Sequence, residues 1–250
     1  MNYIILLFIF ILGSIFGSFY NVVIYRLPLK KSIVFGSSHC TQCNKPLKPL
    51  HLIPILSYIF LNGKCAYCKA TISWRYAFIE FLTGLLFVLV YIRYGYSMYS
   101  LVGFILSSIL IIVAVIDIDT MEILDRFHIL ILLIAIPYII WLSPYLWITH
   151  IIGLLIISIP YYILAWLTQG IGGGDIKLIA VAGFLLGWPQ AVLVFLISSI
   201  SGGIFAIALM IFKKRDQKSS LPFGPFICFG IFVSYLYGHE IINWYLNLLF

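Results

Sequence analysis

The stretch Ala114-Val-Ile-Asp-Ile-Asp-Thr-Met-Glu-Ile-Leu-Asp125 contains the end of a long apolar run and the acidic residues that follow it. The residues before it, from Ser97 to Ile116, carry no charge and are numerous enough to cross a bilayer as a helix. Four acids then follow within nine positions: Asp117, Asp119, Glu122 and Asp125. A carboxylate at or just inside a membrane boundary is costly, which makes it a candidate functional residue. We expect this stretch to supply one member of a catalytic pair and Asp175 to supply the other.

The composition of the chain excludes an ordinary soluble domain. Of its 250 residues, 63% are hydrophobic and only 9% are charged, whereas soluble domains carry about 25% charged residues. The alternating ten-residue patterns of an outer-membrane barrel are missing from the sequence. We predict an all-α fold, a polytopic integral membrane bundle of about eight helices. The expected spans are 4–25, 75–92, 98–116, 127–142, 146–167, 176–186, 191–212 and 223–237; residues 239–250 either extend the last helix or lie at the interface.

The distribution of basic residues predicts the topology. Eight of the fifteen Lys and Arg residues lie between Arg26 and Arg75, and the run Lys213–Lys218 adds four more. Basic loops stay on the cytoplasmic side, so the N-terminus should face outward. This orientation places Asp117 and Asp175 at inner helix ends. Nucleic-acid binding is the alternative explanation for the basic clusters, and we predict no direct nucleic-acid partner.

Four of the five cysteines form two Cys-x-x-Cys pairs. Twenty-one residues separate the pairs, and turn-forming residues follow each pair. This spacing is typical of a closed tetrahedral zinc site, whose four sulfur ligands leave no position for a substrate. Two disulfides are the alternative, but they require an oxidising compartment. The predicted structural zinc ligands are Cys40, Cys43, Cys65 and Cys68, whereas Cys228 is expected to be a small core residue.

Two neighbouring carboxylates can share a proton, so that one activates water while the other donates a proton. Asp117 and Asp119 would point about 200° apart on a helix, so only one of them can face Asp175. The alternative is that helix-end acids are simply solvated, which suits Asp119, Glu122 and Asp125 in particular. Asp175 follows three glycines and could be a helix N-cap, although capping does not explain the glycine run.

The sequence resembles the type IV prepilin peptidases, which are bacterial membrane aspartic proteases. Four segments carry the resemblance: Gly17-Ser-Phe-Tyr-Asn-Val-Val-Ile-Tyr-Arg-Leu-Pro28, the tetracysteine segment from His39 to Tyr76, the acidic stretch Asp117–Asp125, and Gly172-Gly-Gly-Asp-Ile-Lys177. The family usually has proline before the last acid of the third segment, where this chain has Leu124. Leucine could let the helix continue and change how Asp117 and Asp119 are presented.

The resemblance implies both the reaction and the residues that perform it. The enzyme would cleave the basic leader of prepilin-like proteins after a glycine at the membrane face. Family members often then methylate the new N-terminus from S-adenosylmethionine. Alignment favours Asp117 over Asp119 as the partner of Asp175. The remaining residues expected to bind substrate or shape the site are Gly172, Gly173, Gly174 and Lys177.

We therefore predict three parts: a first transmembrane helix (1–26), a cytoplasmic zinc-binding loop (27–74) and a transmembrane peptidase core (75–250). The protein should lie in the bacterial inner membrane, with lipid and prepilins or competence pseudopilins as partners. One rival function is an ion- or proton-coupled transporter that uses Asp117 and Asp175. Transporter sites usually lie near the bilayer midplane, however, rather than at helix ends. A second rival is a non-catalytic assembly factor that docks through the cysteine loop.

Overall fold

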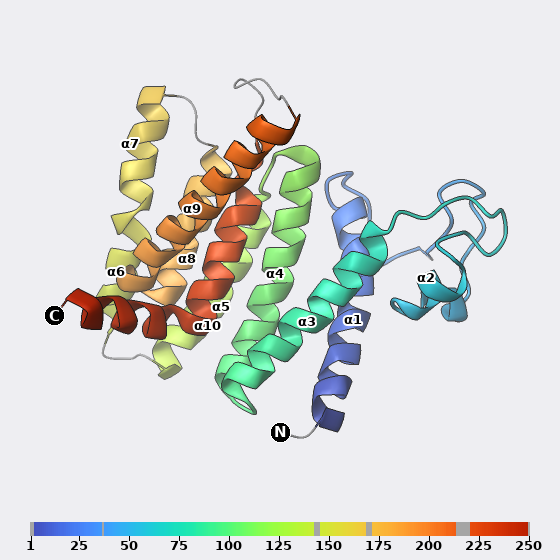
Figure 1. Ribbon diagram of the computed structural model, residues 1–250, viewed down its shortest axis with the longest axis horizontal. Coiled ribbons are helices and arrows are strands. Elements are labelled where there is room, and N and C mark those ends of the chain that lie inside the picture. The colour runs from blue at the N-terminus through green and yellow to red at the C-terminus, as the bar shows by residue number, and fades with distance from the viewer. Residues whose placement is uncertain (1–2, 37, 143–145, 169–171, 214–220, 250) are drawn as a thin grey trace. The chain divides into compact units, whose positions relative to one another are not determined.

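The computed structural model describes residues 3–36, 38–142, 146–168, 172–213 and 221–249 (Figure 1). Helices dominate these residues, and the only β pairing among them is two isolated bridges in the cysteine loop. The expected turn at Ser143-Pro144, part of the Gln169–Asp175 loop and most of the Lys213–Lys218 run lie outside the described residues. The elements are α1 (Tyr3–Arg26), η1 (Pro49–Leu52), α2 (Leu56–Phe60), α3 (Arg75–Tyr94), α4 (Met98–Thr120), α5 (Asp125–Leu142), α6 (Trp147–Ile156), α7 (Ser158–Thr168), α8 (Gly173–Leu186), α9 (Trp188–Lys213) and α10 (Gly224–Leu249).

The predicted all-α membrane class is confirmed. Within the described residues, six helical segments are long and apolar enough to cross a bilayer: Tyr3–Arg26, Arg75–Tyr94, Met98–Thr120, Trp147–Thr168, Trp188–Phe212 and Gly224–Leu248. The other two predicted spans form the helices α5 and α8. Because α8 has 14 residues, it is about 21 Å long, which is shorter than a hydrocarbon core of about 30 Å.

Two compact units make up the chain, residues 1–112 and 113–250. In the first unit, α1 packs along α3 (Figure 1). A Cβ added at Gly13 would lie 2.8 Å from Cα of Gly84, and one at Gly17 would lie 2.8 Å from Cα of Glu80. The small residues expected to bring the first helix close to a neighbour therefore do so, because any side chain there would separate the two backbones.

In the second unit, α8 packs against α5, α6, α7, α9 and α10. The crossing of α6 and α8 is especially close, since a Cβ on Gly183 would lie 2.1 Å from the carbonyl oxygen of Gly153. The body of α8 is thus enclosed by five helices, while its first turn, which carries Asp175, is half-buried.

The predicted single helix over 146–167 is wrong in detail, because it is interrupted at Ile157 between α6 and α7. Pro160 lies in the first turn of α7 and explains the interruption. Proline has no N–H to donate, and its ring clashes with the carbonyl four residues earlier, here that of Ile156 at the end of α6. The C-terminal residues from His239 to Leu249 continue α10.

The helix that leads into the acidic stretch ends later than predicted. The helix α4 continues to Thr120 rather than ending at Ile116, so both Asp117 and Asp119 lie within its last turn. It stops there because Met121 adopts a left-handed backbone, with φ 55°, and its N–H bonds the Asp117 carbonyl at 2.9 Å. Leu124 therefore does not extend the helix, and α5 begins at the next residue.

Candidate active site and metal centre

Asp117 is a buried carboxylate at the end of α4, with 4% of the residue exposed. Its Oδ2 accepts a hydrogen bond of 2.9 Å from the backbone N–H of Gly224. That N–H belongs to the first turn of α10, where backbone donors have no partner within the helix. The donated N–H and the positive end of the helix dipole favour the ionised form of Asp117 and oppose the effect of its burial, which favours the neutral acid.

Gly224 is a site residue that the sequence reasoning missed. A Cβ at this position would lie 2.6 Å from Oδ2 of Asp117, so only glycine lets the carboxylate approach so closely. The available signal was Pro222-Phe-Gly-Pro225, which spans the start of an apolar helix. Proline favours the first turn of a helix, but nothing in the local sequence connects that turn to an acid 107 positions earlier.

Asp175 lies in the first turn of α8, whose N-cap is Gly172. The alternative interpretation of Asp175 as the N-cap is therefore wrong, because the helix begins two residues before it. The side chains of Asp175 and Asp117 are near enough to interact electrostatically. Asp119, two positions from Asp117 on the same helix, is exposed instead. The second unit thus brings Asp117 together with Asp175.

The three glycines before Asp175 have different surroundings. A Cβ at Gly174 would lie 2.9 Å from Cβ of Ile123, whereas a Cβ at Gly173 would meet nothing within 4 Å. A Cβ at Gly172 would approach only the carboxyl group of Asp175, at 3.2 Å. Gly174 is therefore required for packing against the segment that follows α4, while Gly173 has open space beside it.

Lys177 pairs with Asp125, which joins the two motifs of the second unit. The Lys177 Nζ lies 2.7 Å from Oδ1 of Asp125, and Nδ1 of His128 lies 3.4 Å from the same oxygen. The Asp125 side chain is exposed to solvent, as expected of a helix-end acid, and it also has a cationic partner in Lys177. The Lys177 and Asp125 side chains are 57% and 67% exposed, so the pair adds little to stability. It does link the start of α5 to the first turns of α8.

The four cysteines of the loop meet at one point. One ligand atom from each of Cys40, Cys43, Cys65 and Cys68 lies within 4.8 Å of the others. Sγ of Cys40 is 3.8 Å from Sγ of Cys68, and all of these thiols are free. A tetrahedron with Zn–S bonds of about 2.3 Å has edges of about 3.8 Å. The cluster therefore has the dimensions of a metal site and not of two disulfides.

The two halves of this cluster have the same backbone fold. The residues after the second cysteine of each pair, Asn44 and Lys69, are left-handed, with φ 55° and 61°. Each N–H bonds the carbonyl of the first cysteine, at 2.9 and 3.1 Å. Backbone N–H groups of Cys43 and Gln42 lower the pKa of the Cys40 thiol to about 6. Such bonds favour the thiolate, the form that binds a metal.

A bundle of apolar helices, two acids at helix ends of which Asp117 is buried, and a tetracysteine loop are the features of a membrane-embedded peptidase of the aspartic type. The chain belongs to the type IV leader peptidase family. The model of that family matches residues 104–207, and the model of the bacterial peptidase A24 N-terminal domain matches residues 11–94.

Three similar proteins are each named prepilin leader peptidase/N-methyltransferase. The one from Bacillus subtilis is 38% identical over 96% of this chain and 97% of its own length. Those from Aeromonas salmonicida and Neisseria gonorrhoeae are each 32% identical, over 96% and 95% of this chain and 93% of their own lengths. No solved structure gives a significant match. These findings confirm the predicted family and enzyme class and give no support to the transporter.

Proposed function

We propose that this protein cleaves the leader of prepilin-like proteins after a glycine at the cytoplasmic membrane face, with Asp117 and Asp175 as the catalytic pair. Family membership supports the reaction class. The observation that carries the assignment of residues is the hydrogen bond that holds the buried Asp117 at the end of α4, with Asp175 in the first turn of α8 of the same compact unit. Asp119 remains the alternative to Asp117, but its exposure makes it the weaker candidate.

The surroundings of the two acids suggest different roles. Asp117 accepts the Gly224 N–H, which favours its carboxylate form. Among the described residues no donor bonds the Asp175 carboxyl group, and both its removal from water and the nearby charge of Asp117 disfavour a negative charge there. We assign Asp117 as the general base and Asp175 as the initially protonated acid.

The reaction then follows in two proton-balanced steps. Water attacks the carbonyl carbon of the scissile bond, gives its proton to Asp117, and the carbonyl oxygen takes the proton of Asp175. In the second step the leaving nitrogen takes the proton from Asp117 and the C–N bond breaks. One hydroxyl of the intermediate returns its proton to Asp175 as the carboxylic acid product forms. Neither a metal ion nor a covalent intermediate is required.

The tetracysteine loop would hold a structural zinc ion. Its four sulfurs have the spacing that a tetrahedral thiolate site requires. The bound ion would cross-link the segments around Cys40 and Cys65, which have little secondary structure of their own. Its four ligands would all be sulfurs of this chain, so its contribution is to folding of the loop.

A second activity, N-methylation of the new N-terminus from S-adenosylmethionine, is proposed on the names of the relatives. The amine nitrogen would attack the methyl carbon of the donor. The carbon–sulfur bond would break to leave a neutral thioether, and the amine would lose a proton. The substrate system, whether competence pseudopilins, pili or secretion, is part of the proposal.

The proposed location is the bacterial inner membrane, with the N-terminus outside and the active site at the cytoplasmic face. The basic residues between Arg26 and Arg75 support this orientation. The proposed functional parts remain 1–26, 27–74 and 75–250. Leader cleavage tests the function directly: Asp175→Asn should insert normally into the membrane and leave a co-expressed prepilin uncleaved.

A further inference from the structure

His128 is a buried histidine that the proposed mechanism does not use. It lies in the first turn of α5 and is 5% exposed. Among the residues that the structure describes, neither of its ring nitrogens makes a hydrogen bond, although both are enclosed by protein atoms. A buried polar group without a bond costs about 1–3 kcal/mol, so its presence in a folded protein requires an explanation.

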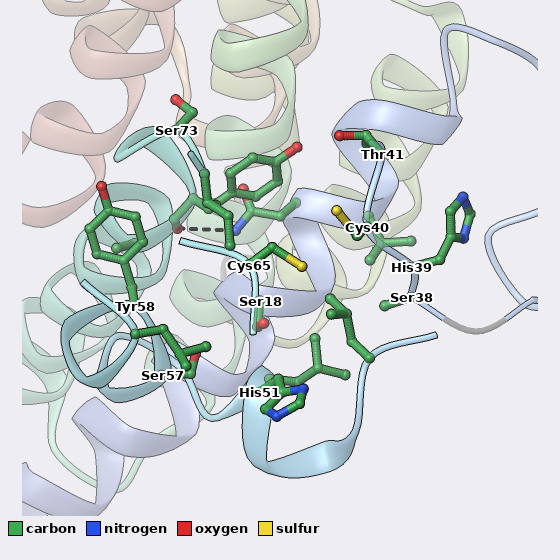
Figure 2. Close-up of a pocket in the computed structure, with 18 of the residues that line it drawn as sticks. Ser18, Ser38, His39, Cys40, Thr41, His51, Ser57, Tyr58, Cys65 and Ser73 are labelled. Atoms are coloured by element: carbon green, nitrogen blue, oxygen red, sulfur yellow. Dashed lines mark hydrogen bonds between the residues drawn. The ribbon is translucent and has the colours of Figure 1, made fainter. Parts of the chain in front are cut away.

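Two other described side chains contain an enclosed polar atom without a hydrogen bond, His51 and Ser234. For His51 this holds for one ring nitrogen only, and the residue lines a pocket of about 430 Å³ beside the cysteine loop, within residues 1–112 (Figure 2). Ser234 lies inside α10, where a hydroxyl can rotate toward the carbonyl four residues earlier. His128 differs from both, because all of its polar side-chain atoms are affected and it belongs to the unit that contains the proposed catalytic pair.

The groups around the His128 ring come from α5 and α8. Its Nδ1 lies 3.4 Å from Oδ1 of Asp125, in the same turn of α5. From α8, the Nζ of Lys177 lies 2.7 Å from that same oxygen, and the backbone of Gly174 interacts with the ring. The ring therefore lies where the first turn of α5 contacts the first turns of α8.

The first turn of α8 requires support from outside, because its own residues supply little. Glycine loses more conformational freedom on folding than any other residue, and three glycines precede Asp175. A Cβ at Gly173 would meet nothing within 4 Å. Of the three, only Gly174 approaches another segment, with its Cβ position 2.9 Å from Cβ of Ile123. The position of Asp175 therefore depends on how Gly174 is held.

Contacts from α5 reach this turn on both sides of Asp175. The Lys177–Asp125 pair contacts it two residues after Asp175, and His128 faces Gly174 one residue before it. The ion pair is more than half exposed, so it is a weak link. The imidazole is enclosed, and a hydrogen bond shielded from water is stronger than an exposed one. His128 is therefore the better placed of the two contacts to fix the catalytic carboxyl group.

We propose that His128 is a positioning residue of the peptidase, whose imidazole N–H bonds the Gly174 backbone carbonyl when substrate is bound and so fixes the Asp175 carboxyl group. The inference rests on the proposed catalytic pair. Hydrogen bonds in active sites are often long in the free enzyme and tighten in the substrate complex. The donor is already enclosed next to this backbone segment, so only a small shift is required. Its contribution is to the rate of the chemical step and not to substrate affinity.

Kinetics of leader cleavage by the purified full-length protein test this role, at equal amounts of folded protein. His128→Phe keeps a planar ring without a donor, and kcat should fall by about 10- to 100-fold while KM changes by less than about twofold. His128→Asn and His128→Gln place an amide N–H near the positions of Nδ1 and Nε2. One of them should restore kcat to within about threefold of the unsubstituted protein. His239→Phe, which replaces an exposed histidine of α10, is the matched control and should leave kcat and KM unchanged.

Hydrogen exchange provides a readout that does not depend on cleavage. With a non-cleavable prepilin peptide bound, the amides of residues 172–177 should exchange several-fold faster in His128→Phe than in the amide variant that restores kcat. If His128→Phe does not fold, the two amide variants carry the test, because one of them must retain kcat and slow exchange.

Three results would overturn the positioning role: unchanged kcat in His128→Phe, a loss of tenfold or more in both amide variants at normal stability, or a rise in KM in place of the fall in kcat. Asp175→Asn distinguishes these results from failure of the proposed function. Normal cleavage by Asp175→Asn would contradict the catalytic pair itself. An inactive Asp175→Asn beside a fully active His128→Phe would overturn only the role of His128.

Discussion

The backbone N–H of Gly224 donates a 2.9 Å hydrogen bond to Oδ2 of Asp117, across 107 positions of sequence. One group begins α10 and the other ends α4. The contact fixes the carboxylate in place and stabilises its charged form. It also explains why a residue without a side chain occupies position 224, since a Cβ there would overlap the carboxylate oxygen.

Gly224→Ala should impair both activity and stability. The new Cβ would overlap a buried carboxylate, so the free energy of unfolding should fall by about 1–3 kcal/mol, and cleavage is compared at equal amounts of folded protein. Cleavage of a prepilin peptide should fall by about 10- to 100-fold, because the new Cβ displaces Asp117. Gly203→Ala in α9, where a Cβ meets nothing within 4 Å, is the control. Full activity of Gly224→Ala would contradict the role assigned to the contact between Gly224 and Asp117.

Asp117→Asn and Asp119→Asn should differ strongly although they lie two residues apart. Loss of a general base typically costs about 100- to 10,000-fold in rate. We expect that loss for Asp117→Asn and less than about threefold for the exposed Asp119. Leader cleavage in membranes with equal amounts of each variant measures the difference. The reverse order of damage would move the catalytic role to Asp119.

Asp175→Asn should also abolish cleavage while the protein remains inserted. Asparagine cannot supply the proton that we assign to this carboxyl group. Substrate binding should survive, so a catalytically inactive variant should still co-purify with an uncleaved prepilin. Undiminished cleavage would contradict the proposed peptidase mechanism as a whole.

Gly173 and Gly174, which precede Asp175, allow a matched pair of alanine substitutions. Gly174→Ala should destabilise the protein by about 1–3 kcal/mol and impair cleavage, because its Cβ would press on Ile123. Gly173→Ala should leave stability unchanged or slightly improved. A rise in KM for Gly173→Ala at normal stability would indicate that the substrate passes beside it. Equal destabilisation by the two substitutions would contradict the packing argument.

Purified protein should contain close to one equivalent of zinc. The double substitution Cys40→Ser and Cys65→Ser should remove it, since it takes one ligand from each pair. Cys228→Ala, which removes a buried cysteine of α10, should leave the zinc content unchanged. Elemental analysis measures the zinc content of the three proteins. An active protein purified without zinc would contradict the assignment of the four cysteines as a zinc site.

Local sequence patterns were sufficient to predict the class of the fold and the four residues of the cysteine cluster. Length and lack of charge identify spanning helices wherever they occur. The Cys40 and Cys65 pairs each form their own turn, so spacing alone indicates that they can meet. Helix ends were predicted less well, because the left-handed cap at Met121 is not obvious from a methionine.

The sequence by itself determined that Asp117 and Asp175 are acids at the ends of apolar helices, because charge in such a place is visible from hydropathy. It also determined that only one of Asp117 and Asp119 could face Asp175, because helical periodicity separates them. The family alignment favours Asp117, and the tertiary structure supplies the physical difference by burying Asp117 and exposing Asp119. Only the tertiary structure decided what holds the Asp117 carboxylate. Gly224 contacts it because helices far apart in the sequence pack together, and no local sequence pattern predicts that contact.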